Sequence, residues 1–163
     1  MVLYLPRDAA SVPVSRQVLD GCLATLGVTP DTRADIALAL DEACANVIQH
    51  ATFGQAYEVQ VRARNGQCAI EVLNTGSADA QIAPHDSVTG IQGDGREVFG
   101  AMLTGDPVPP TAEHGRGLQI IDTVADNLQL IGNEHQGLTV HFEKTLQWLP
   151  GAPGQHLLDP QRE

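Results

Sequence analysis

The segment DEACANVIQHA contains an acid and an amide, Glu42 and Asn46, at a spacing of four residues. On a helix this spacing places both side chains on one face, at the edge of the apolar stripe of the same segment. An amide oxygen is a hard ligand for Mg²⁺, and a carboxylate can orient or deprotonate a nucleophile. The same pair is common on solvated helix faces, so the spacing alone leaves both interpretations open.

A second polar residue, Asn74, ends the alternating apolar segment CAIEVLN. Strict alternation points its side chain to the same side as the apolar residues, toward the face that helices cover. With the Thr75-Gly76 turn that follows, it can present a polar edge to a flat heterocycle. Asn, Thr and Gly are also turn formers, and taken alone the segment fits an ordinary turn better.

The third segment, EHGRGLQIIDTVAD, places Gly115 and Gly117 just before an expected helix, with Arg116 between them. Small residues let backbone N–H groups approach a phosphate, and a helix N-terminus favours the negative charge. The alternative is a glycine-rich loop that enters a helix without binding a ligand. The spacing fits neither the P-loop nor the Rossmann pattern.

Two consecutive helices must position the acid and the amide. The first has apolar residues at intervals of four, with two leucines beside them, and this predicts one apolar face toward the core. Those residues are Val14, Val18, Cys22 and Leu26, with Leu19 and Leu23. Gly27 is the expected C-terminal stop, and Thr29-Pro30-Asp31 is the expected start of the second helix, which extends to about residue 50.

Alternating apolar residues predict strands at residues 2–5, 59–64 and 68–74, with Asn65-Gly66 as a hairpin turn. After residue 115 a helix leads to strands near 128–131 and 138–142. The predicted fold class is α+β: a two-layer sandwich with a mixed, mostly antiparallel sheet and helices on one face.

Residues 77–114 lack periodicity and are rich in Gly, Pro, Asp and Thr. Long connections of this kind are often lids or binding loops, and a disordered insertion is the equal alternative. A short helix is expected at about 94–103. The expected organisation is one domain over residues 1–149, followed by a poorly ordered tail over 150–163.

Composition limits the classes of function. The 163 residues carry a formal net charge of −11 and have no Lys/Arg stripe, which disfavours binding to nucleic acid. No apolar run is long enough to span a membrane and no secretory signal is visible, so we expect a cytoplasmic protein. Cys22, Cys44 and Cys68 form no CxxC pair, and buried reduced thiols are the expected state.

The order of these segments resembles the N, G1 and G2 boxes of the gyrase/histidine-kinase ATPase superfamily, and within it most closely the bacterial anti-sigma-factor serine kinases. The segments DIALALDEACANVIQHA, IEVLNTG, GRGLQIIDTVAD and GLTVHFEK carry the resemblance, which covers residues 13–144. It implies a Bergerat-type ATP-binding fold, ATP and Mg²⁺ as cofactors, and a lid at residues 77–114.

The resemblance also implies roles for individual residues. Glu42 would be the catalytic base and Asn46 the Mg²⁺ ligand. The cofactor-binding residues would be Asn46, Asn74, Gly76, Gly115, Arg116, Gly117 and Leu118, with Asn74 and Gly76 at adenine and the Gly115–Gly117 segment at the phosphates. The nearby His50 and His114 receive no role.

The G1 box departs from the family's Asp-x-Gly-x-Gly pattern. Asn74 stands where the family has the acid that accepts a hydrogen bond from adenine, and the second glycine is absent. Asn keeps an acceptor oxygen, but it lacks the charge and adds an NH₂ donor. Charge-assisted hydrogen bonds are roughly twice as strong as neutral ones, so we expect altered or weaker nucleotide affinity.

Two hypotheses for the function follow. The first is an anti-sigma-factor-type serine/threonine protein kinase that phosphorylates an anti-sigma antagonist and regulates transcription through partner switching. The second is a non-catalytic module that sequesters a sigma factor or another regulator. The intact Glu42 and Asn46 favour the first hypothesis, and the altered G1 box favours the second. The resemblance also implies a homodimer.

Overall fold

The computed structural model describes residues 1–50, 54–75, 116–133 and 137–157. This part contains a five-stranded sheet with the strand order β1-β2-β3-β5-β4, in which each of the four neighbouring pairs is antiparallel. The strands are β1 (Val2–Pro6), β2 (Ala56–Arg64), β3 (Gln67–Thr75), β4 (Asn127–Asn133) and β5 (Gly137–Thr145). The expected α+β sandwich is confirmed. We expected a mixed, mostly antiparallel sheet, and all of its described strand pairs are antiparallel.

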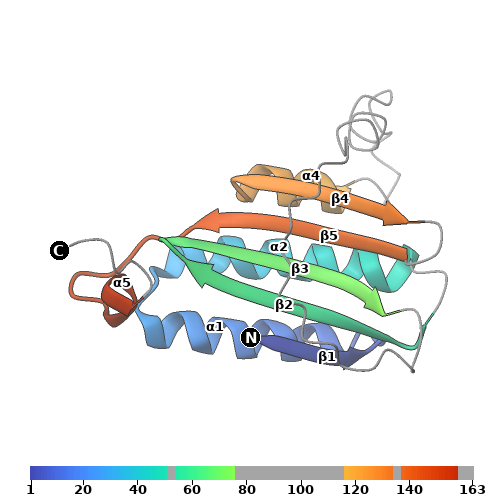
Figure 1. Cartoon of the computed structure of the whole chain (residues 1–163), viewed down its shortest axis with the longest axis horizontal. Coiled ribbons are helices and arrows are strands. Elements are labelled where there is room, and N and C mark those ends of the chain that lie inside the picture. Colours follow the sequence, from blue (N-terminus) through green and yellow to red (C-terminus); the bar gives the residue numbers. More distant parts are fainter. Residues whose placement is uncertain (51–53, 76–115, 134–136, 158–163) are drawn as a thin grey trace.

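Three helices cover one face of this sheet, behind the strands in the view of Figure 1. They are α1 (Ser11–Leu26), α2 (Pro30–His50) and α4 (Arg116–Val124). The short helix α5 (Pro153–Leu157) lies at one end of the molecule. The expected lid at residues 77–114 and the expected helix at 94–103 lie outside the described residues.

The turn signals in the sequence are found where they were predicted. Gly27 ends α1 in the left-handed conformation, with φ 82°, and the Val28 N–H donates to the Leu23 carbonyl at 3.0 Å. Asn65 and Gly66 both have positive φ, 52° and 74°, as a two-residue hairpin between β2 and β3 requires. The two helices and the central hairpin are therefore set by local sequence.

The buried face of α1 differs from the predicted one. Its buried residues are Ser11, Ser15, Leu19 and Leu23, while Val14, Val18 and Cys22 are exposed. The two serines can be buried because their hydroxyl groups form hydrogen bonds. Ser11 Oγ lies 2.7 Å from the buried Tyr57 hydroxyl, and Ser15 Oγ donates to the Val12 carbonyl at 2.8 Å. The expectation that all three cysteines are buried is wrong for Cys22 and confirmed for Cys44 and Cys68.

The core lies between the sheet and the helices. α2 contributes Ile36, Leu40, Ala43, Cys44 and Val47, each at most 1% exposed, against Val59, Ile70, Val72, Val140 and Phe142 of the sheet. α4 contributes Ile121, which is fully buried. Glu42 and Asn46 remain half-buried beside this stripe, as predicted.

The segment after β5 packs on the helices through residue 157. Leu149 N–H donates to the Gly27 carbonyl at 2.8 Å, and a Cβ built on Gly27 would lie 2.6 Å from the Cβ of Ala152. This differs from the poorly ordered tail expected from residue 150, since α5 and its buried Gly154 belong to the fold. Residues 158–163 lie outside the described part.

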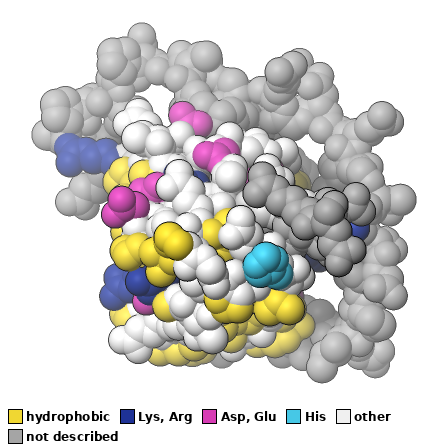
Figure 2. Space-filling view, turned by 90° about the vertical axis from the view of Figure 1, so that its left-hand side faces the viewer, with side chains coloured by type: hydrophobic (Ala, Val, Ile, Leu, Met, Phe, Trp, Pro, Cys, Tyr) yellow, Lys and Arg dark blue, Asp and Glu magenta, His cyan; other side chains and the backbone are white. Residues whose placement is uncertain are grey.

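The end of the molecule that carries α5 is shown in Figure 2. Hydrophobic side chains gather toward the lower edge of this face, on the side where α1 lies in Figure 1, and charges of both signs are scattered above them. Among the described residues visible in this view, the Lys and Arg side chains form no continuous stripe.

Candidate functional site

Glu42 and Asn46 lie one turn apart on α2, at the margin of its buried stripe. The Asn46 side-chain Nδ2 donates a hydrogen bond to the Glu42 backbone carbonyl at 2.9 Å. This bond holds the amide group through one of its two N–H donors, and the amide oxygen on the other branch keeps its capacity as an acceptor. The α2 surface therefore presents a carboxylate and an oriented amide oxygen side by side.

Gly117, in the first turn of α4, lies directly against this pair. A Cβ built on Gly117 would be 2.7 Å from the Glu42 Oε2 and 3.3 Å from the Asn46 Nδ2. Only a residue without a side chain lets the α4 backbone approach so closely. The free N–H groups and the positive dipole end of α4 thus lie beside the acid and the amide, an arrangement that suits an anionic ligand.

The neighbours of Gly117 have different environments. Arg116 is the first residue of α4 and is exposed, whereas Leu118 is partly buried and packs on the core. Leu118 therefore fixes the first turn of α4 on the core, and Arg116 leaves a cation at the surface. Gly76, Gly115 and His114, which were also singled out in the sequence, lie outside the described residues. His50 is exposed at the end of α2.

Asn74 occupies the position that strand alternation predicted. It is 7% exposed and pairs in register with Tyr57, which is fully buried on the helix side of the sheet. Its side chain therefore faces the layer that contains α2. A buried amide at the end of a central strand is a polar group within an otherwise apolar surface.

The thiol nearest to this site is not a reactive group. Burial raises the pKa of Cys44 to about 11, although its contacts with Ser15 and Tyr57 lower that pKa. Burial likewise raises the pKa of Tyr57 to about 12. Both groups are protonated at neutral pH, so the cluster of Ser11, Ser15, Cys44 and Tyr57 joins α1, α2 and β2 without supplying a nucleophile.

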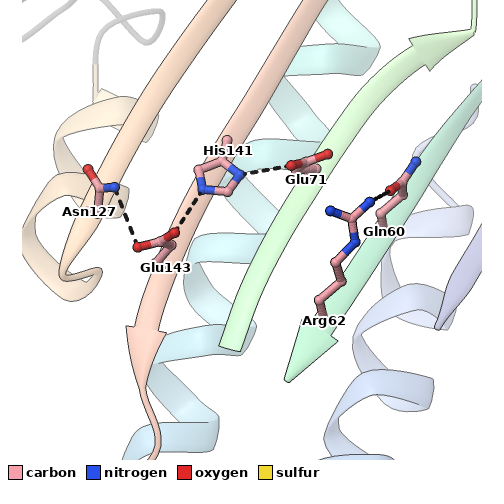
Figure 3. Close-up of polar contacts among 6 residues, drawn as sticks. All are labelled: Gln60, Arg62, Glu71, Asn127, His141 and Glu143. Atoms are coloured by element: carbon pink, nitrogen blue, oxygen red, sulfur yellow. Dashed lines mark hydrogen bonds and ion pairs between the residues drawn. The ribbon is translucent and has the colours of Figure 1, made fainter. Parts of the chain in front are cut away.

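The opposite face of the sheet carries a separate polar cluster, shown in Figure 3. His141 of β5 lies between two carboxylates, with Nδ1 3.2 Å from Glu71 Oε1 and Nε2 3.3 Å from Glu143 Oε1. The hydrogen bond with Glu71 raises the pKa of His141, and the same bond lowers the pKa of Glu71. This cluster links β3 to β5 on the side away from Glu42, so we exclude it from the candidate site.

The described residues contain no group of three or more His, Cys, Asp or Glu side chains that could hold a metal ion. Mg²⁺ is usually bound through one or two protein oxygens together with substrate phosphates, and it does not need such a group. The amide group of Asn46 lies beside the first turn of α4, and its oxygen could supply one such protein ligand.

A family of known proteins matches most of the chain. The histidine kinase-like ATPase domain family matches residues 5–144, a range that contains Glu42, Asn46, Asn74 and Gly117. The chain belongs to this family. Membership implies nucleotide use.

The chain's individual relatives are serine-protein kinases. The chain is similar to serine-protein kinase RsbW of Bacillus cereus strain AH820, with 29% identity over 146 residues. It is also similar to the RsbW proteins of Bacillus cereus strain G9842, with 26% identity over 145 residues, and Bacillus mycoides strain KBAB4, with 24% over 153. Each match covers 89% of this chain and 84% of the relative.

Two features of the site were not predicted. The sequence analysis gave Gly117 a role in phosphate binding but did not predict its close contact with Glu42. That contact depends on packing between residues that are 75 positions apart. The second feature is an ion pair between Lys144 of β5 and Asp35 of α2, with Nζ 2.8 Å from Oδ2. The sequence contains a sign of this ion pair. Val140 and Phe142 of β5 are buried, and Lys144 is the next residue on the same side of the strand, where a charged side chain needs a partner.

Proposed function

We propose that this chain is an ATP-dependent serine/threonine protein kinase of the anti-sigma-factor type. It would transfer the γ-phosphoryl group of ATP to a serine of an anti-sigma antagonist in the cytoplasm, and so regulate transcription through partner switching. The observation that carries the proposal is the contact of Gly117 with Glu42 and Asn46, because it brings the first turn of a helix against a carboxylate and a side-chain amide.

Different residues would bind the phosphates, the Mg²⁺ ion and the adenine ring of ATP. Arg116, Gly117 and Leu118 in the first turn of α4, together with the preceding residue in the sequence, Gly115, would bind the phosphates through backbone N–H groups and the positive end of the helix. Asn46 would hold Mg²⁺ through its side-chain oxygen, and the ion would neutralise charge on the phosphates. Asn74, followed by Gly76, would meet the adenine ring at the end of β3.

Glu42 would act as the general base. Its carboxylate would accept the proton of the serine hydroxyl while the serine oxygen forms a bond to the γ-phosphorus and the bond to the β-phosphate oxygen breaks, releasing ADP. Phosphoryl transfer needs little covalent help from the protein, so correct placement of the acceptor hydroxyl is the main contribution. The half-buried position of Glu42 beside α4 supports this role.

The second candidate function is a binding module without catalysis, which sequesters a sigma factor. One observation favours it: Asn74 replaces the expected acid in the buried position at the end of β3, so the adenine contact lacks its charge. The two functions differ in whether they require Glu42. A kinase needs its carboxylate as a base, whereas a sequestering module does not.

The deciding experiment is transfer of labelled γ-phosphate to purified anti-sigma antagonists, with the parent protein and Glu42→Gln. Gln has nearly the shape of Glu but cannot accept a proton, so we expect unchanged ATP affinity and a rate lowered about 10²–10⁴-fold. Transfer by Glu42→Gln at the parental rate would remove Glu42 from the mechanism. Tight sigma-factor binding by a parent that shows no transfer would favour the module.

A further inference from the structure

Lys144 is a cation on the helix side of the sheet. It pairs in register with the fully buried Cys68, and its own side chain is 18% exposed. Its neighbour Glu143 belongs to the opposite face, in the cluster around His141. The aliphatic stem of Lys144 therefore crosses the layer between sheet and helices, and its ammonium group emerges between two of them.

The ammonium group contacts both helices of the candidate site. Nζ lies 2.8 Å from Asp35 Oδ2 on α2, and it donates a hydrogen bond to the carbonyl oxygen of Val124, the last residue of α4. A cation at that position satisfies a carbonyl that the helix leaves unpaired and complements the negative end of its dipole. One side chain thus ties the C-terminal end of α4 to α2.

The other ends of the same helix segments meet at the candidate site. Asp35 precedes Glu42 by seven residues on α2, and Val124 follows Gly117 by seven residues on α4. At 1.5 Å per residue both segments are about 10.5 Å long. The two helices therefore run antiparallel, in contact at Glu42 and Gly117 at one end and bridged by Lys144 at the other.

We propose that Lys144, together with Asp35, is a positioning residue for the nucleotide site, and this proposal rests on the proposed function. α4 has nine residues, of which Ile121 is fully buried and Leu118 and Val124 are partly buried against the core, so contacts at its C-terminal end add to a short apolar interface in setting its position along α2. Without the ammonium group, α4 can shift along α2, which moves Gly117 away from Glu42 and Asn46 at the far end.

The test uses Lys144→Met, which keeps the aliphatic stem and removes the charge and the donors. We expect Mg·ATP affinity, measured by calorimetry, to fall about three- to tenfold. Amide hydrogen exchange of residues 118–124, measured without nucleotide, should become faster. Asp35→Asn should have the same effects in a weaker form, and it provides the test if Lys144→Met fails to fold. Lys144→Arg keeps a cation and should restore most of the affinity.

Arg33→Met is the matched control. Arg33 also joins two helices through an ion pair, with Asp20 of α1 at 2.9 Å, and its loss changes the net charge by the same amount. We expect it to leave both Mg·ATP affinity and α4 exchange at parental values. Equal losses in Arg33→Met and Lys144→Met, or parental affinity and exchange in Lys144→Met, would overturn the proposal.

The two readouts separate this proposal from the proposed function. A parent protein that fails to bind Mg·ATP contradicts the proposed function. Faster α4 exchange in Lys144→Met would in that case still show that Lys144 holds α4 on α2, whereas unchanged exchange would contradict the positioning role as well.

Discussion

At the scale of single residues, the site depends on a missing side chain as much as on reactive ones. Glu42 and Asn46 supply chemistry that many helices could offer, but Gly117 brings the N-terminus of a second helix within contact of both. A carboxylate next to the positive end of a helix has its charge stabilised there. Ligand phosphates placed at the same helix end would lie within reach of the amide oxygen.

At Asn74 we predict a gain in nucleotide affinity from introducing the acid that the family pattern has at this position. Asn74→Asp should tighten Mg·ATP binding, because a carboxylate accepts a stronger hydrogen bond from the adenine amino group than a neutral amide does. Calorimetric titration of the parent and the variant measures the change. Equal affinities would show that the amide serves adenine as well as the acid would.

At the scale of elements, periodicity identified α1 but only part of its buried face. The predicted face contained Leu19 and Leu23, which are buried, and Val14, Val18 and Cys22, which are exposed; Ser11 and Ser15 are buried in their place. The hydroxyl of Ser11 is satisfied by Tyr57, 46 positions away in the sequence. A local pattern contains no information about such a partner, so the error has a physical cause.

The assigned face of α1 can be tested with two neighbouring truncations. Leu19 is 3% exposed and Val18 is 39% exposed, so Leu19→Ala should lower the free energy of unfolding by about 2–5 kcal/mol. Val18→Ala should change it by no more than about 0.5 kcal/mol. Urea unfolding of both variants measures the difference. A larger loss of unfolding free energy for Val18→Ala than for Leu19→Ala would show that Val18 faces the core, as the sequence predicted.

Other elements were predictable because their signals are local. The Asn65-Gly66 turn, the Gly27 stop and the alternation that buries Asn74 all depend on residues within one turn or one strand. The contacts that assemble the site are not local. Gly117 meets Glu42, and Lys144 meets Asp35, across long stretches of sequence, so the sequence could name candidate site residues but not their arrangement.

The link between β3 and β5 makes stability depend on pH. The pKa of His141 is raised from 6.5, so its contribution is fully present below pH 6.5 and is lost as pH rises through the raised value. The pKa of Glu71 is lowered from 4.5, so its contribution is present above pH 4.5 and is lost as pH falls through the lowered value. The pair therefore stabilises the sheet most between about pH 4.5 and 6.5.

Substitution of His141 should remove the alkaline part of this dependence. We expect His141→Gln to cost about 0.5–1 kcal/mol at pH 5.5 and less at pH 8.5, because the parent loses the charge pair as rising pH deprotonates His141. His156→Gln on the exposed surface of α5 is the control and should cost the same at both values. Urea unfolding at the two pH values measures both. An equal cost for His141→Gln at pH 5.5 and 8.5 would show that the pair of His141 and Glu71 does not cause this pH dependence.

At the scale of the whole molecule, an acidic chain must bind an anionic ligand. The net charge of −11 repels phosphates at long range, but charges farther away than about 8 Å are largely screened at physiological salt. Within that distance the candidate site offers the N-terminus of α4, Arg116 and an amide oxygen suited to Mg²⁺. On the proposed function, local geometry outweighs overall charge at this site. Among the described residues, no helix is long and apolar enough to cross a membrane.

Calorimetric titration of Mg·ATP into the parent, Gly117→Ala and Gly21→Ala tests the central claim most directly. Gly21 is the control, because a Cβ at this α1 position meets nothing within 4 Å, whereas one at Gly117 would lie 2.7 Å from Glu42 Oε2. We expect saturable binding by the parent and Gly21→Ala, with Gly117→Ala at least about tenfold weaker, a loss of about 1.4 kcal/mol. A parent that does not bind at millimolar Mg·ATP, or three proteins with equal affinity, would contradict a nucleotide site between α2 and α4.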